Sequence, residues 1–150
     1  MTATQQPDPF DAAPPSTGPS GPRAGFWIRF GAYILDSIII VAVSLPFSFI
    51  DPALYYVVAL AGGIAYYVLL EGGPRGQTVG KLACGIRVID LGRGGPIGYG
   101  RAFIRYVGRI VSGIAILLGY LWMLWDKEKQ TWHDKFADAV VVPTSSYPVG

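Results

Sequence analysis

Two long apolar runs near the start of the chain predict a pair of membrane-crossing helices. Residues 25–50 carry only two charges, Arg29 and Asp36, and Pro52–Leu70 carries none. About 24 helical residues span roughly 36 Å, which exceeds the ~30 Å hydrocarbon layer of a bilayer. The very short connection at Asp51 predicts that the two helices form an antiparallel hairpin.

A third apolar run, Ile110–Trp125, is slightly shorter than the usual minimum of about 17 residues for a crossing. The preceding segment Arg101–Arg109 places its three arginines on one helical face, which predicts an amphipathic helix at the membrane surface. Two topologies stay open. Either the third run crosses and the C-terminus is external, or it re-enters and the C-terminus is cytoplasmic.

Two short segments, Ala83–Asp90 and Ala137–Val142, have the composition of β-strands, and a Gly-rich turn follows the first. If these strands pair, both must lie on one side of the membrane, which favours the re-entrant topology. The predicted fold class is therefore an all-α integral membrane protein. It has two or three transmembrane helices, an amphipathic helix and a small cytoplasmic β element.

Composition supports a multi-pass membrane protein and narrows the chemistry. Apolar residues make up 51% of the chain and charged residues 15%, against about 25% charged in a typical soluble domain. One cysteine cannot form a disulfide within the chain, and one histidine and one cysteine are too few for a four-ligand zinc site. We therefore expect no bound metal and no cofactor.

The basic residues predict the orientation. Seven of them, against the single acid Asp90, lie between residues 72 and 109. The positive-inside rule places this block on the cytoplasmic side of the cell membrane, and the two crossings before it place the N-terminus there too. We expect the block to contact anionic lipid headgroups and not nucleic acid.

The chain divides into three predicted parts. Residues 1–24 are Pro-rich and predict a disordered cytoplasmic tail, because they have too little apolar surface to offset the entropy of ordering. Residues 25–142 form the predicted membrane domain, and residues 143–150 a flexible C-terminal tail. No basic segment followed by an apolar run precedes residue 25, so the first helix is expected to direct insertion itself.

Arg29 and Asp36 are the main candidates for a polar site inside the membrane. They are seven residues apart, so they share a helix face with Tyr33 and lie about 10 Å apart along the axis. Each charge within a span costs roughly 2.5–3.5 kcal/mol on insertion scales. Asp36 must therefore face protein or a water-filled cavity. It is either a site that binds an ion or a proton, or a polar contact that fixes the packing of the helices.

Two further positions have alternative interpretations. Glu71 ends the second run on the side where Arg29 begins the first, so it is either the partner of Arg29 or a solvated helix end. His133, next to Asp134, either hydrogen-bonds within an interfacial turn or relays protons, since histidine titrates near neutrality. No nucleophile is paired with this histidine, and residues 72–81 lack the pattern of a phosphate loop, so we expect no enzyme.

Four segments together resemble the RDD family of small, mostly bacterial membrane proteins. They are Gly25–Ile40, Gly76–Asp90, the pair Arg101 and Arg105, and Gln130–Val142. The resemblance implies that Arg29 is the family arginine, Asp36 the first aspartate and Asp134 the second. It also implies a membrane fold, and some members of the family look like cation/proton antiporters.

The predicted functional cluster contains Arg29, Asp36 and Asp134, with Tyr33, Glu71, His133 and Arg105 as secondary members. The favoured function is small-cation or proton transport through this cluster. Transport would require a homo-oligomer, because three short helices are too few to enclose a pathway. The alternative is a non-catalytic structural or adaptor module that binds anionic lipid or a partner membrane protein.

Overall fold

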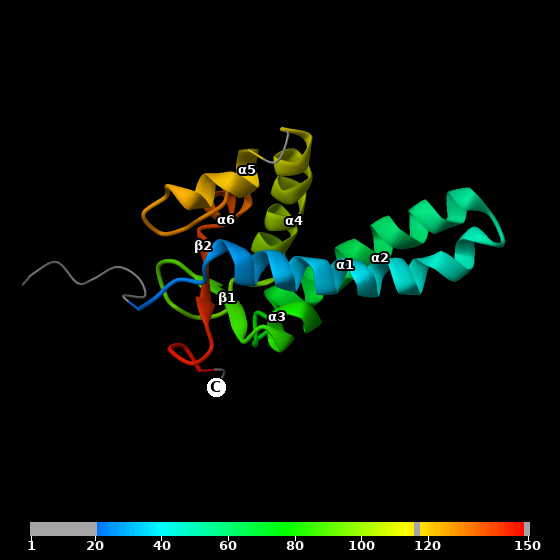
Figure 1. Ribbon diagram of the computed structural model, residues 1–150. Helices are drawn as coiled ribbons and strands as arrows, with labels where there is room; N and C mark the ends of the chain where they lie inside the picture. The colour runs from blue at the N-terminus through cyan, green and yellow to red at the C-terminus, as the bar shows by residue number, and fades with distance from the viewer. Residues whose placement is uncertain (1–20, 116–117, 149–150) are drawn as a thin grey trace, which may run out of the picture.

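Two long antiparallel helices dominate the computed structural model, which describes residues 21–115 and 118–148. These are α1 (Phe26–Ser48) and α2 (Pro52–Gly72), and they form a hairpin that projects from the rest of the molecule (Figure 1). Both have a mean hydropathy of 1.9 and are long and apolar enough to cross a membrane. The two helices predicted first are therefore present. The predicted N-terminal tail lies mostly outside the described residues.

The turn of the hairpin follows from local sequence. Pro46 lies in the last turn of α1, and the helix ends two residues later, at Ser48. Asp51 then caps α2, because its carboxylate accepts a hydrogen bond from the Ala53 amide at 2.7 Å. Pro52 occupies the first helical position, where a missing amide hydrogen costs nothing.

The remaining elements gather around the other end of the hairpin, where α1 begins and α2 ends (Figure 1). They are the helices α3 (Val79–Ala83), α4 (Tyr99–Ile114), α5 (Leu118–Leu121) and α6 (Trp132–Phe136), the 3₁₀ helix η1 (Trp122–Leu124), and the strands β1 (Ile86–Asp90) and β2 (Ala139–Pro143). The described part of the chain is mostly helical, as predicted, and contains one small sheet.

The two strands pair in an antiparallel sheet, in which Val88 lies opposite Val141 and Asp90 opposite Ala139. One face of the sheet belongs to the main apolar core, which contains Ile86, Val88, Ala139 and Val141. The other face forms a smaller cluster of Ile89, Val140 and Val142. Because both faces are covered, β2 is apolar at successive positions from Ala139 to Val142, whereas β1 also contains the buried charged residues Arg87 and Asp90. The predicted strand pairing is confirmed.

The third apolar run does not form one straight helix. The amphipathic segment continues through α4 to Ile114, and α5 with η1 is bent by 112° from the α4 axis. The α4 helix runs across the α1–α2 hairpin and not alongside it (Figure 1). The predicted helix Ile110–Trp125 was therefore wrong in its boundaries, because its first residues belong to α4 and its last ones to a separate, bent segment.

Short helix α3 packs tightly against α1 through a glycine. A Cβ atom at position 80 would collide with the carbonyl oxygen of Ala32 and lie 2.8 Å from Oδ1 of Asp36. Only glycine allows the α3 backbone to approach α1 this closely. The backbone of α3 is thereby brought within hydrogen-bonding range of the Asp36 carboxylate.

The predicted C-terminal tail begins within a regular element. Pro143 is the last residue of β2, and Tyr147 packs against the smaller apolar cluster of the sheet. The Arg87 guanidinium donates to the carbonyl oxygen of Pro148 at 2.9 Å. Residues 143–148 therefore lie against the sheet, where a flexible tail was predicted.

Candidate functional site

Asp134 sits at the centre of one buried ion-pair group. It lies in the first turn of α6, and its carboxylate accepts a hydrogen bond at 3.2 Å from the amide of Thr131, which precedes the helix. Its Oδ2 accepts from Nη2 of Arg29 at 2.5 Å, and its Oδ1 accepts from Nε of Arg105 at 3.1 Å. Asp134 is fully buried. One carboxylate thus joins α1, α4 and α6.

Glu71, at the end of α2, is the second buried carboxylate of this group. It pairs with Nζ of Lys81 at 2.6 Å and with Nη2 of Arg109 at 3.0 Å. Nη1 of Arg105 also donates to Glu71, so Arg105 bridges Glu71 and Asp134. We call these six residues the ion-pair network: Arg29, Glu71, Lys81, Arg105, Arg109 and Asp134. The network connects five helices, α1, α2, α3, α4 and α6.

Asp36 forms a separate polar contact set, made with neutral donors. Its Oδ2 accepts from the Thr78 hydroxyl at 2.6 Å. Its Oδ1 accepts from the Tyr66 hydroxyl at 2.7 Å and from the Gly80 amide at 2.8 Å. Asp36 is fully buried. Since all these donors lie on α2 or at α3, the carboxylate holds three segments together.

The surroundings of Asp134 keep it ionised. Burial by itself would raise the pKa of this carboxyl group, because the charged form loses its water. The neighbouring charges of Arg29 and Arg105 outweigh burial and hold the pKa well below its usual value of 3.8. The carboxylate is therefore anionic at any physiological pH.

His133 has the opposite protonation behaviour. Burial lowers its pKa well below the usual 6.5, and the nearby guanidinium groups reinforce this although Asp134 opposes it. Its ring packs against Tyr120, with 5.0 Å between ring centroids. The imidazole is therefore neutral near pH 7.

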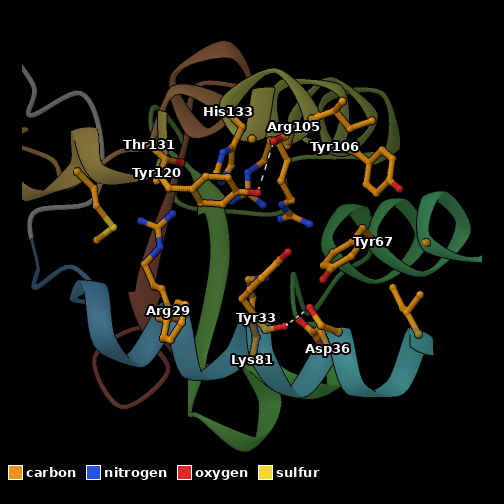
Figure 2. Close-up of a pocket in the computed structure, with 18 of the residues that line it drawn as sticks. Arg29, Tyr33, Asp36, Tyr67, Lys81, Arg105, Tyr106, Tyr120, Thr131 and His133 are labelled. Atoms are coloured by element: carbon orange, nitrogen blue, oxygen red, sulfur yellow. Dashed lines mark hydrogen bonds between the residues drawn. The ribbon is translucent and has the colours of Figure 1, made fainter. Parts of the chain in front are cut away.

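A cavity of about 610 Å³ lies between α1, α2, α4 and the α5–α6 region. Figure 2 shows Arg29, Tyr33 and Asp36 rising from α1 on one side of it, with Arg105, Thr131 and His133 on the opposite side. Much of its wall is apolar. The apolar lining consists mainly of Phe26, Phe30, Ile40, Val41, Ala59, Gly63, Ile110, Gly113, Leu121 and Met123.

Three buried polar atoms that belong to residues lining this cavity have no hydrogen-bond partner within the described ranges. They are Nη1 of Arg109, Oγ1 of Thr131 and Nδ1 of His133. Over residues 21–115 and 118–148, only one other buried side-chain atom, Nε of Arg87, lacks a partner. Because an unsatisfied buried donor costs about 1–3 kcal/mol, their concentration around one cavity indicates a place where a ligand could bind.

Both predicted interpretations of Glu71 were wrong, because it is buried and therefore no solvated helix end, and its partners are cations other than Arg29. Within the part of the chain that the structure describes, Arg29 donates to Asp134 and to the carbonyl oxygen of Lys129, and Glu71 is paired with other cations. The reason is that α4 and α3 insert their own basic side chains at the end of α2. Arg29 also makes no hydrogen bond to Asp36, although the two share a helix face.

The other predicted members fall at the edge of the cavity or inside the network. Arg105 is at the centre of the ion-pair network, whereas Tyr33 is half-exposed and contacts the ring of Tyr120. The sequence analysis missed Lys81 and Arg109 as network members. The signal was the excess of basic residues between positions 72 and 109, which requires acids from elsewhere if any of these cations are buried.

The basic face of α4 does not point outward as predicted. Arg105 is buried in the ion-pair network, and Arg101 donates to the Asp90 carboxylate and to the carbonyl oxygen of Ala137. In the block between residues 72 and 109, Arg75 and Arg93 remain exposed. Most of the block thus binds the protein's own acceptors.

The fold and the network define a small helical protein with two helices able to cross a membrane and a buried arginine–carboxylate network at one end of them. The chain belongs to the RDD family, whose family model matches residues 23–138. This confirms the resemblance found in the sequence. No solved structure matches the chain.

Several curated proteins are similar. The chain is 32% identical over 139 residues to a Bacillus subtilis protein named "Uncharacterized membrane protein YteJ", with 83% of each chain covered. It is 35% identical over 85 residues to the "Proline-rich antigen homolog" of Mycobacterium tuberculosis, covering 55% of this chain. The match spans only 35% of that mycobacterial protein, so about two thirds of the relative has no counterpart in the alignment.

Replacing Asp134 by Asn should destabilise the fold by roughly 3–5 kcal/mol, because two buried guanidinium groups would lose their carboxylate. The measurement is the thermal unfolding midpoint of the protein purified in mild detergent. Asp138→Asn is the matched control. Asp138 is exposed, its carboxylate has no partner among residues 21–115 and 118–148, and its positive φ of 47° suits asparagine. Coinciding midpoints for the two variants would contradict the proposed importance of the network.

Acidification from pH 6.5 to 5 should lower the free energy of unfolding, because His133 takes up a proton in the unfolded chain but stays neutral in the folded one. The slope from this single group is at most about 1.4 kcal/mol per pH unit. His133→Gln should flatten the profile in that window. Both proteins should lose further stability below about pH 4, where the unfolded carboxyl group of Asp134 becomes protonated first. An unchanged slope in the variant would refute this assignment.

Proposed function

We propose that the chain is a multi-pass integral membrane protein in which α1 and α2 cross the bilayer. The 23 residues of α1 span about 35 Å, enough for the hydrocarbon layer. Large apolar side chains are exposed along the hairpin, including Trp27, Ile38, Val43, Tyr56 and Leu60. A continuous apolar surface of this kind is unfavourable in water and favourable in lipid. The relative named as a membrane protein supports the same location.

The proposed orientation has the sheet and the N-terminus on the cytoplasmic side of the cell membrane. The basic residues lie at the end of the hairpin where the sheet is found, and the connection at residues 49–51 lies at the far end. The pairing of β1 with β2 requires an even number of crossings between them. We therefore favour α4 lying along the interface and the α5–η1 segment returning to the same side.

The function that the geometry supports best is a non-catalytic structural or binding module. The observation that carries this proposal is the ion-pair network, in which the charges of Arg29, Arg105 and Asp134 are used to hold helices together. Buried charges arranged in this way are best suited to fixing one arrangement of helices. A membrane domain that is rigid at its cytoplasmic end can present a cavity or surface to lipid or to a partner membrane protein.

Small-cation or proton transport is the second candidate, and one specific observation favours it. The Asp36 carboxylate borders the cavity and lies within α1, so an ion that enters the cavity would approach a buried acid. Its three hydrogen bonds would have to rearrange for it to bind a cation. Because two crossing helices do not enclose a path, this function again requires a homo-oligomer.

Single-cysteine labelling tests the proposed topology. In a Cys84→Ser background, Ile50→Cys should react from one side of the membrane, and Ser146→Cys from the other. Both positions are exposed, so access depends on the membrane and not on burial. A membrane-impermeant maleimide applied to intact cells and to inverted vesicles distinguishes the sides. Labelling of both cysteines from the same side would show that α1–α2 does not cross as proposed.

Proton flux in proteoliposomes separates the two candidate functions. If the chain is a structural or binding module, a sodium or potassium gradient should drive no proton movement, as followed by an internal pH-sensitive dye. If it is a transporter, flux should be present and Asp36→Asn should abolish it. The matched control is Asp51→Asn, because Asp51 lies in the connection at the far end and asparagine caps a helix equally well. Cation-driven flux that Asp36→Asn abolishes and Asp51→Asn preserves would overturn the module proposal.

A further inference from the structure

The cavity has a polar end and an apolar end. Arg105 and Arg109 of α4 border it at one end, together with Thr131, which precedes α6, and His133 of α6. Ile40, Val41, Ala59 and Gly63 border it further along the hairpin. A molecule that fits both ends must itself be amphipathic. The volume of about 610 Å³ lies within the range of roughly 300–1,000 Å³ that is typical of small-molecule sites.

The charges around the cavity favour an anion. The ion-pair network contributes four cations, Arg29, Lys81, Arg105 and Arg109. The buried carboxylates of Asp36, Glu71 and Asp134 supply three negative charges, so the cations outnumber the carboxylates by one, although each cation has a carboxylate partner. An anionic ligand group would balance this excess of positive charge at the polar end of the cavity.

The unpartnered atoms indicate where the anionic group would bind. Nη1 of Arg109 is a donor that its own salt bridge leaves unused, since Nη2 alone contacts Glu71. The Thr131 hydroxyl is a second unused donor, and its residue is 2% exposed. Neutral His133 supplies a third donor when its hydrogen is on Nδ1. All three residues border the same cavity.

The apolar side of the cavity is open to the surroundings of the hairpin. Phe30, Val41 and Ile110 line the cavity and are 45%, 46% and 46% exposed, respectively. Under the proposed membrane placement, on which this step depends, these side chains face lipid. A lipid-like molecule could therefore enter sideways, with its chain remaining among apolar side chains.

We infer that the cavity binds an amphiphile whose anionic head, a phosphate or a carboxylate, is attached to an alkyl chain. The oxyanion accepts hydrogen bonds from Arg109 and Thr131, which are charge-assisted on the arginine side. The alkyl chain lies against Ile40, Val41 and Ile110. This assigns the ion-pair network a second role, because it holds Arg109 so that Nη2 of its guanidinium donates to Glu71 and Nη1 remains for the ligand.

The test is native mass spectrometry of the full chain in mild detergent, titrated with defined probes. Dioleoyl phosphatidylglycerol or oleate should bind at least tenfold more tightly than dioleoyl phosphatidylcholine. Arg109→Lys keeps a cation for Glu71 but removes the second donor, and it should weaken binding roughly tenfold. Thr131→Val should weaken binding about fivefold, whereas Thr131→Ser retains the hydroxyl and should bind like the parent protein.

The probes also identify the source of the anion. Preference for phosphatidylglycerol assigns a phospholipid head, and preference for oleate assigns a carboxylate, and either outcome supports the inference. Equal binding of phosphatidylcholine would overturn it, as would equal binding of inorganic phosphate alone or unchanged affinity in both Arg109→Lys and Thr131→Val. Labelling that shows no membrane crossing would refute the proposed function first, whereas correct insertion without preferential binding would refute only this inference.

Discussion

The bridging of two buried carboxylates by Arg105 is the interaction on which the rest of this structure depends. Arg105 is 1% exposed and contacts Glu71 at the end of α2 and Asp134 in α6. Removing a guanidinium from water is costly, and the cost is met only if its hydrogen bonds are satisfied in good geometry. The three helices that carry these residues can therefore adopt very few relative positions in which all the charges are paired.

The sheet and the short helices make this pairing possible. The β1–β2 ladder brings residues 139–143 back beside residues 86–90, and α6 directly precedes β2. Asp134 is thereby fixed close to the start of α1, within reach of Arg29. On the other side, Thr78 and Gly80 bind Asp36 and hold α3 so that Lys81 reaches Glu71. The sheet and the short helices α3 and α6 thus position the charges at the end of the apolar hairpin.

The sequence was sufficient to predict the elements that form from extended stretches of apolar residues. The runs 25–50 and Pro52–Leu70 became α1 and α2, and the two apolar segments near positions 86 and 140 became paired strands. These features are encoded by continuous stretches of apolar residues. The interruption of the third run near residue 115 was not predicted, because no proline or charge marks it.

The partners within the site were harder to predict than its members. Arg29, Asp134, Arg105 and Glu71 were all identified as candidates, yet neither interpretation of Glu71, as the partner of Arg29 or as a solvated helix end, matches the structure. The sequence shows which helix ends meet in a hairpin. It does not show which cation pairs with an acid at such an end, because that depends on which other helix packs there. Here α4 crosses the hairpin and supplies two arginines to Glu71. Hydropathy and helical periodicity contain no information about that crossing.

Asp36 and Asp134 differ in the type of donor from which each accepts hydrogen bonds. This difference accompanies the pairing of Arg29 with Asp134, which is more distant in the sequence than Asp36. Asp36 accepts only neutral hydroxyl and amide donors, which leave it inside the apolar hairpin without a guanidinium. Asp134 lies in α6, beyond the hairpin, and accepts hydrogen bonds from two guanidinium groups. Arg29 lies in the first turn of α1, two turns before Asp36, and from there its side chain reaches Asp134 in α6. A charged pair is thus formed at the end of the hairpin, where the cost of burying it is smaller than deep within an apolar span.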